Sequence, residues 1–266
     1  MTSEEFAKPG EFSQLQLMAV CGSRQIKNGA VVFIGTGLPM IAAMLAKRTH
    51  APRAKIVYEA GFVDSNTKDI ALSVGDSRLG YRAAGAMGLI EALGSILQGG
   101  HVDLGFVGAA QIDQYGNINT TYIGPFEKPT VRLPGSGGGN DIISSAKRII
   151  VIMTHERRKM AKKLDYMTSP GFLDGPGARE REGLLGGGPS IVVTDLCQMD
   201  FEPKTKRMRL ATIHPGITTE QILEKTEFEL IIPKNVPTTD LPLRQELKLL
   251  TEIDPKGVYI PPTNPA

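Results

Sequence analysis

A chain of 266 residues with 41% hydrophobic and 22% charged residues is long enough, and apolar enough, to form a globular protein with a sizeable core. Its formal net charge of +2 excludes the strong positive field that binding to nucleic acid or an anionic membrane requires. No apolar run is long enough to span a bilayer, and the acidic start of the sequence is unlike a signal peptide, so we expect a cytoplasmic protein.

The cysteines and histidines do not have the spacing that is typical of metal ligands. Cys21 and Cys197 lie far apart and have no disulfide or zinc spacing, which is typical of a protein from a reducing compartment. The histidines also lack ligand spacing, and we therefore expect no metal site. They are His50, His101, His155 and His214.

Helices and strands alternate in the first half of the chain, which predicts an α/β fold. Apolar spacing predicts a helix over Phe12–Ile26 and a strand over Ala30–Ile34. The next helix, Met40–Lys47, follows the segment Gly35-Thr36-Gly37-Leu38-Pro39, whose proline suits a first helical turn. By itself this glycine segment is a tight turn, whereas beside a bound ligand it is a backbone cradle for an anion.

The stretch that organises the chain is Lys55–Asp64, because it places a carboxylate at the end of an apolar strand. The strand is predicted over Ile56–Tyr58, and Glu59, Ala60 and Gly61 follow directly. An unpaired buried charge is costly, so such a carboxylate is neutralised, paired or used in chemistry. Open α/β sheets bind ligands at the carboxyl ends of their strands. We predict that Glu59 is a nucleophile.

The middle of the chain continues the alternation of helices and strands. A polar loop at Ser73–Arg78 precedes a predicted helix over Met87–Leu97 and a predicted strand over Val102–Val107. Tyr115-Gly116-Asn117 predicts a hairpin turn before an extended segment, Ile118–Ile123.

A second glycine-rich segment, Gly135-Ser136-Gly137-Gly138-Gly139-Asn140, lies between the apolar segment Thr130–Leu133 and a short helix predicted from Ile142. Glycines allow several backbone N–H groups to point into one space, as an oxyanion hole or an anion nest requires. Glycine-rich loops are also flexible connectors. The position of this loop between apolar segments, at the start of a helix, favours the functional interpretation.

The last part of the chain is less informative. A strand over Arg148–Met153 precedes basic residues at 157–159 and 162–163, which form either a solvated helix face or a contact to the phosphates of a ligand. Ile191–Thr194 and Arg207–Ile213 suggest a hairpin around Glu202–Thr205, and a helix is predicted over Thr219–Phe228. We find no internal repeat or domain boundary and predict a single domain over residues 1–266.

The order and spacing of several short motifs is more specific than any one of them. These motifs are Gly35–Pro39, Glu59–Gly61 with Asp64, Ser73–Asp76, Gly108–Asp113, Tyr115–Asn117, Gly135–Asn140, Asp165–Tyr166, Thr168–Gly171 and Asp174–Gly177. Together they resemble the family I CoA-transferases, and within that family the B subunits of the glutaconate CoA-transferase type. The family usually has Ser or Asn where this chain has Ala60, a departure that bears on substrate and reaction subtype.

The resemblance implies the fold and the chemistry. The implied fold is the open, mostly parallel sheet with flanking helices of the CoA-transferase (NagB/RpiA-like) superfamily. Glu59 matches the nucleophile that attacks an acyl-CoA thioester and then carries CoA as a glutamyl-CoA thioester. Gly137 matches the glycine whose N–H serves the oxyanion hole, with Gly138 beside it. Coenzyme A is then a substrate, and no cofactor is expected.

The resemblance also suggests binding residues. Gly35 and Gly37 would line the floor of the same site. The loop residue Asn140 would bind substrate or CoA, and so would Gln111. Gln111, Asp113 and Asn119 either shape the acyl or CoA pocket or are polar residues of the turn and hairpin.

The polar loop that contains Ser73, Asp76 and Arg78 also has two interpretations. Arg78 either holds the distal carboxylate of a dicarboxylic acid by a bidentate pair or forms a structural ion pair.

The family further implies a homologous A subunit, with a site built between the A and B subunits in a heterotetramer or hetero-octamer. We expect the beta subunit of a CoA-transferase that moves CoA between an acyl-CoA and a carboxylic acid, in particular a dicarboxylate. The alternatives are an acyl-CoA hydrolase or decarboxylase on the same scaffold and a non-catalytic subunit that binds a CoA ester. Glu59 favours transfer, because many relatives with the other activities lack this carboxylate.

Overall fold

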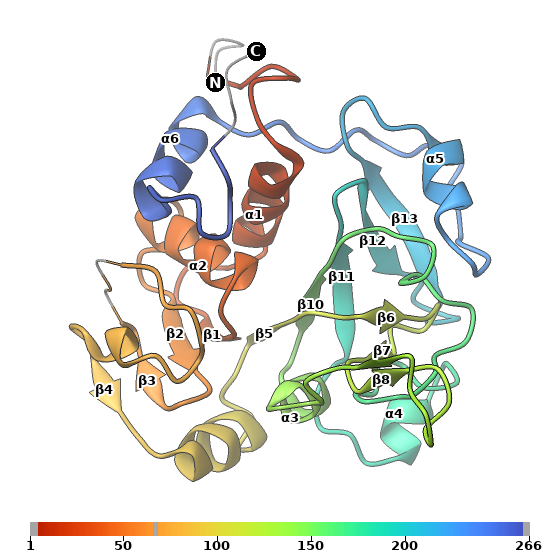
Figure 1. Cartoon of the computed structure of the whole chain (residues 1–266), viewed down its shortest axis with the longest axis horizontal. Helices are drawn as coiled ribbons and strands as arrows, with labels where there is room; N and C mark the ends of the chain where they lie inside the picture. The colour runs from red at the N-terminus through yellow and green to blue at the C-terminus, as the bar shows by residue number, and fades with distance from the viewer. Residues whose placement is uncertain (1–4, 66, 68, 263–266) are drawn as a thin grey trace. The chain divides into compact units, whose positions relative to one another are not determined.

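The computed structural model describes residues 5–65, 67 and 69–262, and the chain divides into two compact units. Unit 1 is formed by Met1–Phe106 and Asp240–Ala266, and unit 2 by Val107–Thr239. Figure 1 labels the helices and strands of both units. The single domain over residues 1–266 stays a prediction.

Parallel strands form the centre of unit 1. Strand β1 (Val31–Ile34) pairs in parallel with β2 (Lys55–Tyr58) on one side and with β5 (Leu104–Val107) on the other. Strands β3 (Phe62–Val63) and β4 (Gly85–Ala86) extend the sheet beyond β2 in antiparallel pairs. The predicted strands at residues 30–34, 56–58 and 102–107 are confirmed, with boundaries shifted by two residues or fewer.

Three helices pack together in unit 1: α1 (Gln14–Arg24), α2 (Leu38–Arg48) and α6 (Arg244–Ile253) (Figure 1). The first two were predicted, and α6 was missed. Arg24 at the end of α1 joins α6 through an ion pair to Glu246, with 2.9 Å between the guanidinium Nη2 and the carboxylate Oε2. Because α6 follows unit 2 in the sequence, unit 1 is assembled from two distant parts of the chain.

Two shorter helical segments complete unit 1. Ser77–Gly80 forms a 3-10 helix, η1, and Glu91–Gln98 forms a π-helix, η2. The helix predicted over 87–97 therefore begins later than expected. The preceding Leu89 and Ile90 are exposed, the latter to 83%.

In unit 2, strand β10 (Ile149–Ile152) pairs in parallel with β11 (Pro189–Val193). Strands β12 (Cys197–Phe201) and β13 (Met208–Ile213) follow β11 in antiparallel pairs. The hairpin around residues 202–205 joins β12 to β13, so the prediction that it joins 191–194 to 207–213 is wrong. The alternation of apolar Cys197, Met199 and Phe201 with polar residues was the signal that would have shown β12.

The remaining elements of unit 2 are short. They are the hairpin of β6 (Gln111–Ile112) and β7 (Ile118–Asn119), the pair β8 (Tyr122–Ile123) and β9 (Val131–Arg132), and the helices α3 (Gly139–Ser145), α4 (Ala178–Arg181) and α5 (Thr219–Glu224). Parallel pairs and antiparallel edge strands occur in both units, and helices pack together in unit 1, so the predicted α/β fold with an open sheet is confirmed. Among the described residues, no helix is long and apolar enough to cross a membrane.

Candidate active site

Glu59 lies in a tight turn directly after the parallel strand β2. The Gly61 N–H donates a hydrogen bond to the Tyr58 carbonyl at 2.8 Å, so Glu59 and Ala60 occupy the tip of the turn between β2 and β3. Val57 of β2 and Val63 of β3 are paired, so the two strands that flank this turn form an antiparallel hairpin. Glu59 itself is half-buried. The backbone therefore fixes the position of the Glu59 main chain at the carboxyl end of a parallel strand.

The space around this turn leaves no room for a side chain at position 61, which is a glycine. It has φ of 93°, in the left-handed region, and a Cβ atom there would lie 2.0 Å from the Met87 carbonyl oxygen. The Met87 N–H also donates a hydrogen bond to the Gly61 carbonyl at 3.0 Å. No side chain fits at this position without moving the turn.

The Gly35–Gly37 segment lies beside Glu59. Ile34 and Tyr58 are register partners in β1 and β2, so Gly35 and Glu59 each follow the last residue of neighbouring parallel strands. Gly37 has φ of 88° and is the N-cap of α2. The structure thus brings the first two predicted elements of the site to one edge of the unit 1 sheet.

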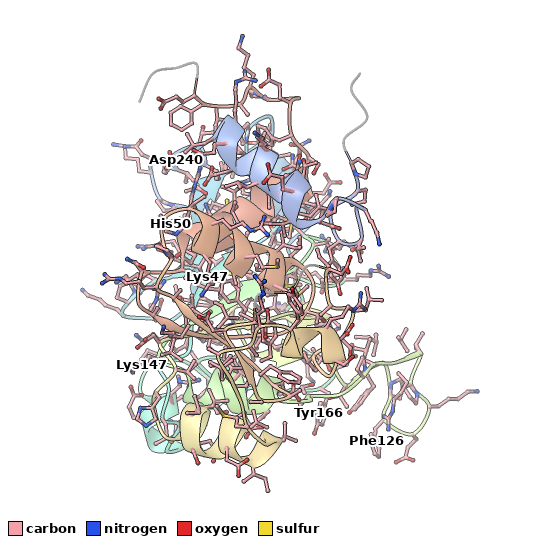
Figure 2. The ribbon with its side chains drawn as sticks, turned by 90° about the vertical axis from the view of Figure 1, so that its left-hand side faces the viewer. Lys47, His50, Phe126, Lys147, Tyr166 and Asp240 are labelled. Atoms are coloured by element: carbon pink, nitrogen blue, oxygen red, sulfur yellow. The ribbon has the colours of Figure 1, made fainter. Side chains whose placement is uncertain are left out.

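An ion pair supports the strand that follows the turn. The ammonium of Lys47, a residue of α2 that is labelled in Figure 2, contacts the Asp64 carboxylate and donates a second hydrogen bond to the Ala54 carbonyl at 2.9 Å. Asp64 has φ of 55°, which is unusual for a residue other than glycine. Asp64 was part of the sequence motif, and its contacts are structural.

Arg78 forms the structural ion pair that was one of its two interpretations. Its Nε donates to both carboxylate oxygens of Asp76, at 2.9 and 3.0 Å. Hydrogen bonding from Arg78 holds the Asp76 carboxyl pKa far below its ordinary range. The guanidinium is thus engaged within its own loop.

In unit 2, the glycine-rich loop is anchored at its start and opens α3. The Gly135 N–H donates to the Thr120 carbonyl at 2.9 Å, and the Thr120 hydroxyl donates back to the Gly135 carbonyl at 2.8 Å. Gly137 has φ of 47° and is exposed, whereas Gly138 is buried and is the N-cap of α3. This bent backbone, tied down at Gly135, is the kind of segment that presents N–H groups to an anion.

The polar residues of the β6–β7 hairpin form a buried network. Gln111 and Asn119 are 6% and 0% exposed, and the Asn119 Nδ2 donates to the Gln111 Oε1 at 2.7 Å. The Gln111 Nε2 donates to the Asp165 carboxylate at 2.7 Å. These contacts support the hairpin interpretation of both residues, and a binding role for Gln111 stays a prediction.

Asn140 at the start of α3 donates from Nδ2 to the Thr168 carbonyl at 2.8 Å. Thr168 also accepts a hydrogen bond at its hydroxyl from the Thr120 N–H at 2.8 Å. Both sides of the glycine-rich loop are therefore attached to the segment around Thr168. Thr168 is the first residue of the sequence motif Thr168–Gly171.

Asp113 orders the turn of the same hairpin. Its carboxylate accepts hydrogen bonds from the Tyr115 N–H at 2.9 Å, the Asn117 N–H at 3.0 Å and the Asn117 Nδ2 at 2.8 Å. Burial raises the pKa of this carboxyl, and the hydrogen bonds from Asn117 and Tyr115 partly offset that effect. Asp113 therefore has a structural role in the turn.

The basic cluster after β10 does not form a helix, so its interpretation as a helix face is wrong. Glu156 accepts from Arg158 at 2.7 Å and pairs with Lys159 at 2.7 Å, and these contacts fold the segment back on itself. Lys162 and Lys163 farther along are exposed.

The cysteines and the potential metal ligands were compared within the described part of the chain. No group of three or more His, Cys, Asp or Glu side chains among those residues is arranged to hold a metal ion. Cys21 and Cys197 are free and buried, and burial raises the pKa of each thiol to about 12. Such thiols remain protonated and are poor nucleophiles.

Comparisons with known proteins identify the family. Residues 16–225 match the family model described as Coenzyme A transferase. The chain is 42% identical over 255 residues to the B subunit of glutaconate CoA-transferase from Acidaminococcus fermentans, an alignment that covers 94% of this chain and 95% of the relative. It is 40% identical over 243 residues to the B subunit of 3-oxoadipate CoA-transferase from Pseudomonas knackmussii, covering 91% and 94%.

The crystal structure of the Acidaminococcus fermentans glutaconate coenzyme A-transferase superposes with a TM-score of 0.87 at 39% identity, over 94% of this chain and 97% of that one. The chain therefore belongs to the coenzyme A transferase family. It is a B subunit of a family I CoA-transferase of the glutaconate CoA-transferase type, and the resemblance seen in its motifs is confirmed.

Proposed function

We propose that this subunit transfers CoA from an acyl-CoA to a carboxylic acid by a ping-pong reaction in which Glu59 carries the CoA. The observation that carries this proposal is the position of Glu59, on a backbone-fixed turn at the carboxyl end of β2 and beside the Gly35–Gly37 segment. An ionised carboxylate needs no general base to attack a thioester.

Each step conserves its atoms and charge. A Glu59 carboxylate oxygen attacks the acyl-CoA carbonyl carbon, the C–S bond breaks, and a mixed anhydride and CoA thiolate result. The thiolate attacks the Glu59 carbonyl carbon, which releases the first acid as its carboxylate and leaves a glutamyl-CoA thioester. A second carboxylate then attacks this thioester, and the same two steps in reverse order yield the new acyl-CoA and free Glu59.

Negative charge develops on a carbonyl oxygen in each of these steps. We assign its stabilisation to the N–H groups of Gly137 and Gly138, and we assign lining of the site to Gly35, Gly37 and Asn140. Support for the first assignment is the anchored bend of the loop at Gly135 and the positive φ of Gly137. One oxyanion-hole donor is typically worth about 3–4 kcal/mol in the transition state.

The names of the relatives suggest the substrate class and the partner. Glutaconate and 3-oxoadipate are both dicarboxylates, so we propose a dicarboxylic acid as acceptor or product. Both relatives are named as B subunits, which implies a companion A subunit. We propose that the two assemble as a heterotetramer or hetero-octamer, with coenzyme A as a substrate and no other cofactor.

The first prediction is a covalent adduct on Glu59. The complex with its A subunit, incubated with glutaryl-CoA in the absence of free acid, should leave part of the Glu59-bearing subunit heavier by the mass of CoA less one water. Intact mass spectrometry measures this adduct. Addition of glutarate or acetate should remove it, because the carboxylate attacks the thioester.

Glu59→Gln is the matched control, since it keeps the size of the side chain and removes the nucleophile. It should form no adduct and show no transfer. Turnover by the natural complex without any adduct, or an adduct that persists in Glu59→Gln, would contradict the proposal. Release of free CoA without acyl exchange would instead indicate a hydrolase on the same scaffold.

A further inference from the structure

The glycine-rich loop of unit 2 has little packing of its own. Gly137 is exposed, and a Cβ atom at Gly135 would meet nothing within 4 Å apart from its chain neighbours. Apart from its own helix, a Cβ atom at Gly139 would meet the Ser169 hydroxyl, at 4.0 Å. Glycine leaves the backbone more conformational freedom than any other residue. Contacts from outside the loop are therefore needed to hold its N–H groups in one arrangement.

The start of the loop is attached to two threonines that lie between β7 and β8. The Leu133 N–H donates to the Thr121 carbonyl at 3.0 Å, and the Gly135 N–H donates to the Thr120 carbonyl at 2.9 Å. The Thr120 hydroxyl donates back to the Gly135 carbonyl at 2.8 Å. Any shift of Thr120 therefore moves the first residue of the loop.

The side chain of Thr168 contacts both of these threonines. Its hydroxyl accepts a hydrogen bond from the Thr120 N–H at 2.8 Å and lies 2.7 Å from the Thr121 hydroxyl. It also donates to the Asn119 Oδ1 at 3.4 Å. Thr168 is 7% exposed, so water competes little for these contacts. One hydroxyl thus fixes the residues to which the start of the loop is attached.

The backbone of Thr168 holds the other end of the loop. Its carbonyl accepts a hydrogen bond from the Asn140 Nδ2 at 2.8 Å. Its N–H donates to the Ile118 carbonyl at 2.8 Å, and the Ile118 N–H donates to the Ser169 carbonyl at 3.0 Å. Thr168 is therefore fixed on strand β7 and contacts the far end of the loop directly, in addition to the near end through Thr120.

We propose that Thr168 is a positioning residue, whose hydroxyl holds the glycine-rich loop in the arrangement that the reaction needs. The inference rests on the proposed function in taking the N–H groups of this loop as donors to the developing oxyanion. Such donors lower the barrier because they are aimed at the position of the charge before it develops. Thr168 acts through Thr120 and not on the reacting atoms. A loop loosened at Thr120 still admits the substrate but no longer fixes its N–H groups.

Thr168→Val tests this role, because it keeps the shape of the side chain and removes the hydroxyl that accepts from the Thr120 N–H. In the complex with the A subunit, kcat should fall by roughly tenfold to 100-fold with little change in KM for acyl-CoA, since the lost alignment matters only in the transition state. Thr168→Ser keeps the hydroxyl and should retain most of kcat. Steady-state kinetics with glutaryl-CoA and acetate measures these values.

Thr226→Val is the matched control. Thr226 is also 7% exposed, and its hydroxyl makes hydrogen bonds to the Ile222 carbonyl at 2.8 Å and to the His155 Nε2 at 3.0 Å. None of these partners belongs to the glycine-rich loop. Thr226→Val should therefore lower the free energy of unfolding about as much as Thr168→Val, as chemical denaturation measures, but leave kcat unchanged. Equal kcat values in the two valine variants, or no recovery in Thr168→Ser, would overturn the role of the Thr168 hydroxyl.

Thr120→Val tests the same path from the side of the loop. It removes the hydroxyl that donates to the Gly135 carbonyl and keeps the N–H that donates to Thr168. This variant should also lower kcat while KM for acyl-CoA stays the same. An unchanged kcat would show that the loop is not positioned through Thr120, and the inference would fail even if Thr168→Val did not fold.

The rate at which the Glu59 adduct forms separates this inference from the transfer mechanism. Mixing with glutaryl-CoA should give the adduct in both the natural complex and Thr168→Val, but more slowly in the variant. Equal rates would overturn the role of Thr168 and leave the mechanism standing. Absence of the adduct from the natural complex, while kcat still falls in Thr168→Val and returns in Thr168→Ser, would overturn the mechanism and leave the positioning role standing.

Discussion

Gly61 shows how one residue without a side chain sets the geometry of the candidate nucleophile. The turn that carries Glu59 closes against the Met87 backbone, through a hydrogen bond and a contact that leaves no room for a Cβ atom. Any larger residue must push the turn away from Met87, and the Glu59 carboxylate moves with it. Displacement of a reacting group by about 1 Å can cost on the order of 100-fold in rate.

We therefore predict that Gly61→Ala lowers kcat by about 100-fold while acyl-CoA still binds. Gly29→Ala is the control, because Gly29 has a similar φ of 87° but nothing within 4 Å of the position of a Cβ atom. Both variants carry the strain of a positive φ, but only Gly61→Ala also places a Cβ atom against the Met87 backbone. Steady-state kinetics of the two variant complexes measures both kcat values. Equal kcat values would show that the contact with Met87 does not cause the loss of rate.

At the scale of the elements, a single buried side chain joins segments that are distant in the sequence. Arg179 of α4 is 4% exposed and donates to the carbonyls of Ile143 and Ser144 in α3, at 3.1 and 3.2 Å. It also donates to the carbonyls of Pro170, Gly171 and Gly186, at 3.1, 2.8 and 3.0 Å. Burial lowers the pKa of this guanidinium. One arginine thus ties the helix that follows the glycine-rich loop to α4 and to the segments around Pro170 and Gly186.

Arg179→Lys should lower the free energy of unfolding by roughly 3 kcal/mol, because an ammonium cannot reach carbonyls that a planar guanidinium bonds on several sides. Chemical denaturation of the complex measures the loss. The same change at Arg181, which is exposed and paired with Asp174, should cost much less, because water screens an exposed ion pair. Equal losses at the two positions would show that Arg179 has no special role.

The sequence predicted the helices and strands that are marked by a residue pattern within a short stretch of the chain. The strand that leads to Glu59 and the glycine turn before α2 were recognised because apolar runs end there at glycine or proline. Helix α6 was missed although Leu243, Leu247 and Leu250 have helical spacing.

Parts of the candidate site had no local signal at all. The contact of Gly61 with Met87 depends on the pairing of β3 with β4, and the acceptors of Arg179 are backbone carbonyls, which no residue type marks. The side-chain network of Gln111 and Asn119 could be assigned only when its partners were known. Sequence therefore located the candidate nucleophile, and the three-dimensional structure was needed to show what holds it.

At the scale of the whole molecule, buried histidines make stability depend on pH. His155 is 1% exposed and lies between the hydroxyls of Thr194 and Thr226, at 3.2 and 3.0 Å. Burial lowers its pKa to about 4, and the nearby Asp195 only partly opposes this effect. In the unfolded chain a histidine has a pKa of about 6.5. The folded protein therefore excludes a proton that the unfolded chain binds between these two pH values.

It follows that the stability contributed by neutral His155 is fully present above pH 6.5 and is lost as the pH falls toward 4, by on the order of 3 kcal/mol. Urea denaturation between pH 7.5 and 4.5 measures this loss. His155→Gln cannot take up the proton and should show a flatter profile over the same window. An equally steep profile in His155→Gln would assign the loss to other groups.

The two-part construction of unit 1 has a consequence for synthesis in the cell. A ribosome exposes α1 and α2 early, but α6, which packs against both, emerges only after the whole of unit 2 has been made. Unit 2 is continuous in sequence and is free to fold while translation proceeds. Until Arg24 meets Glu246, the first helices carry uncovered apolar surface, and that interval is when a nascent chain most needs a chaperone.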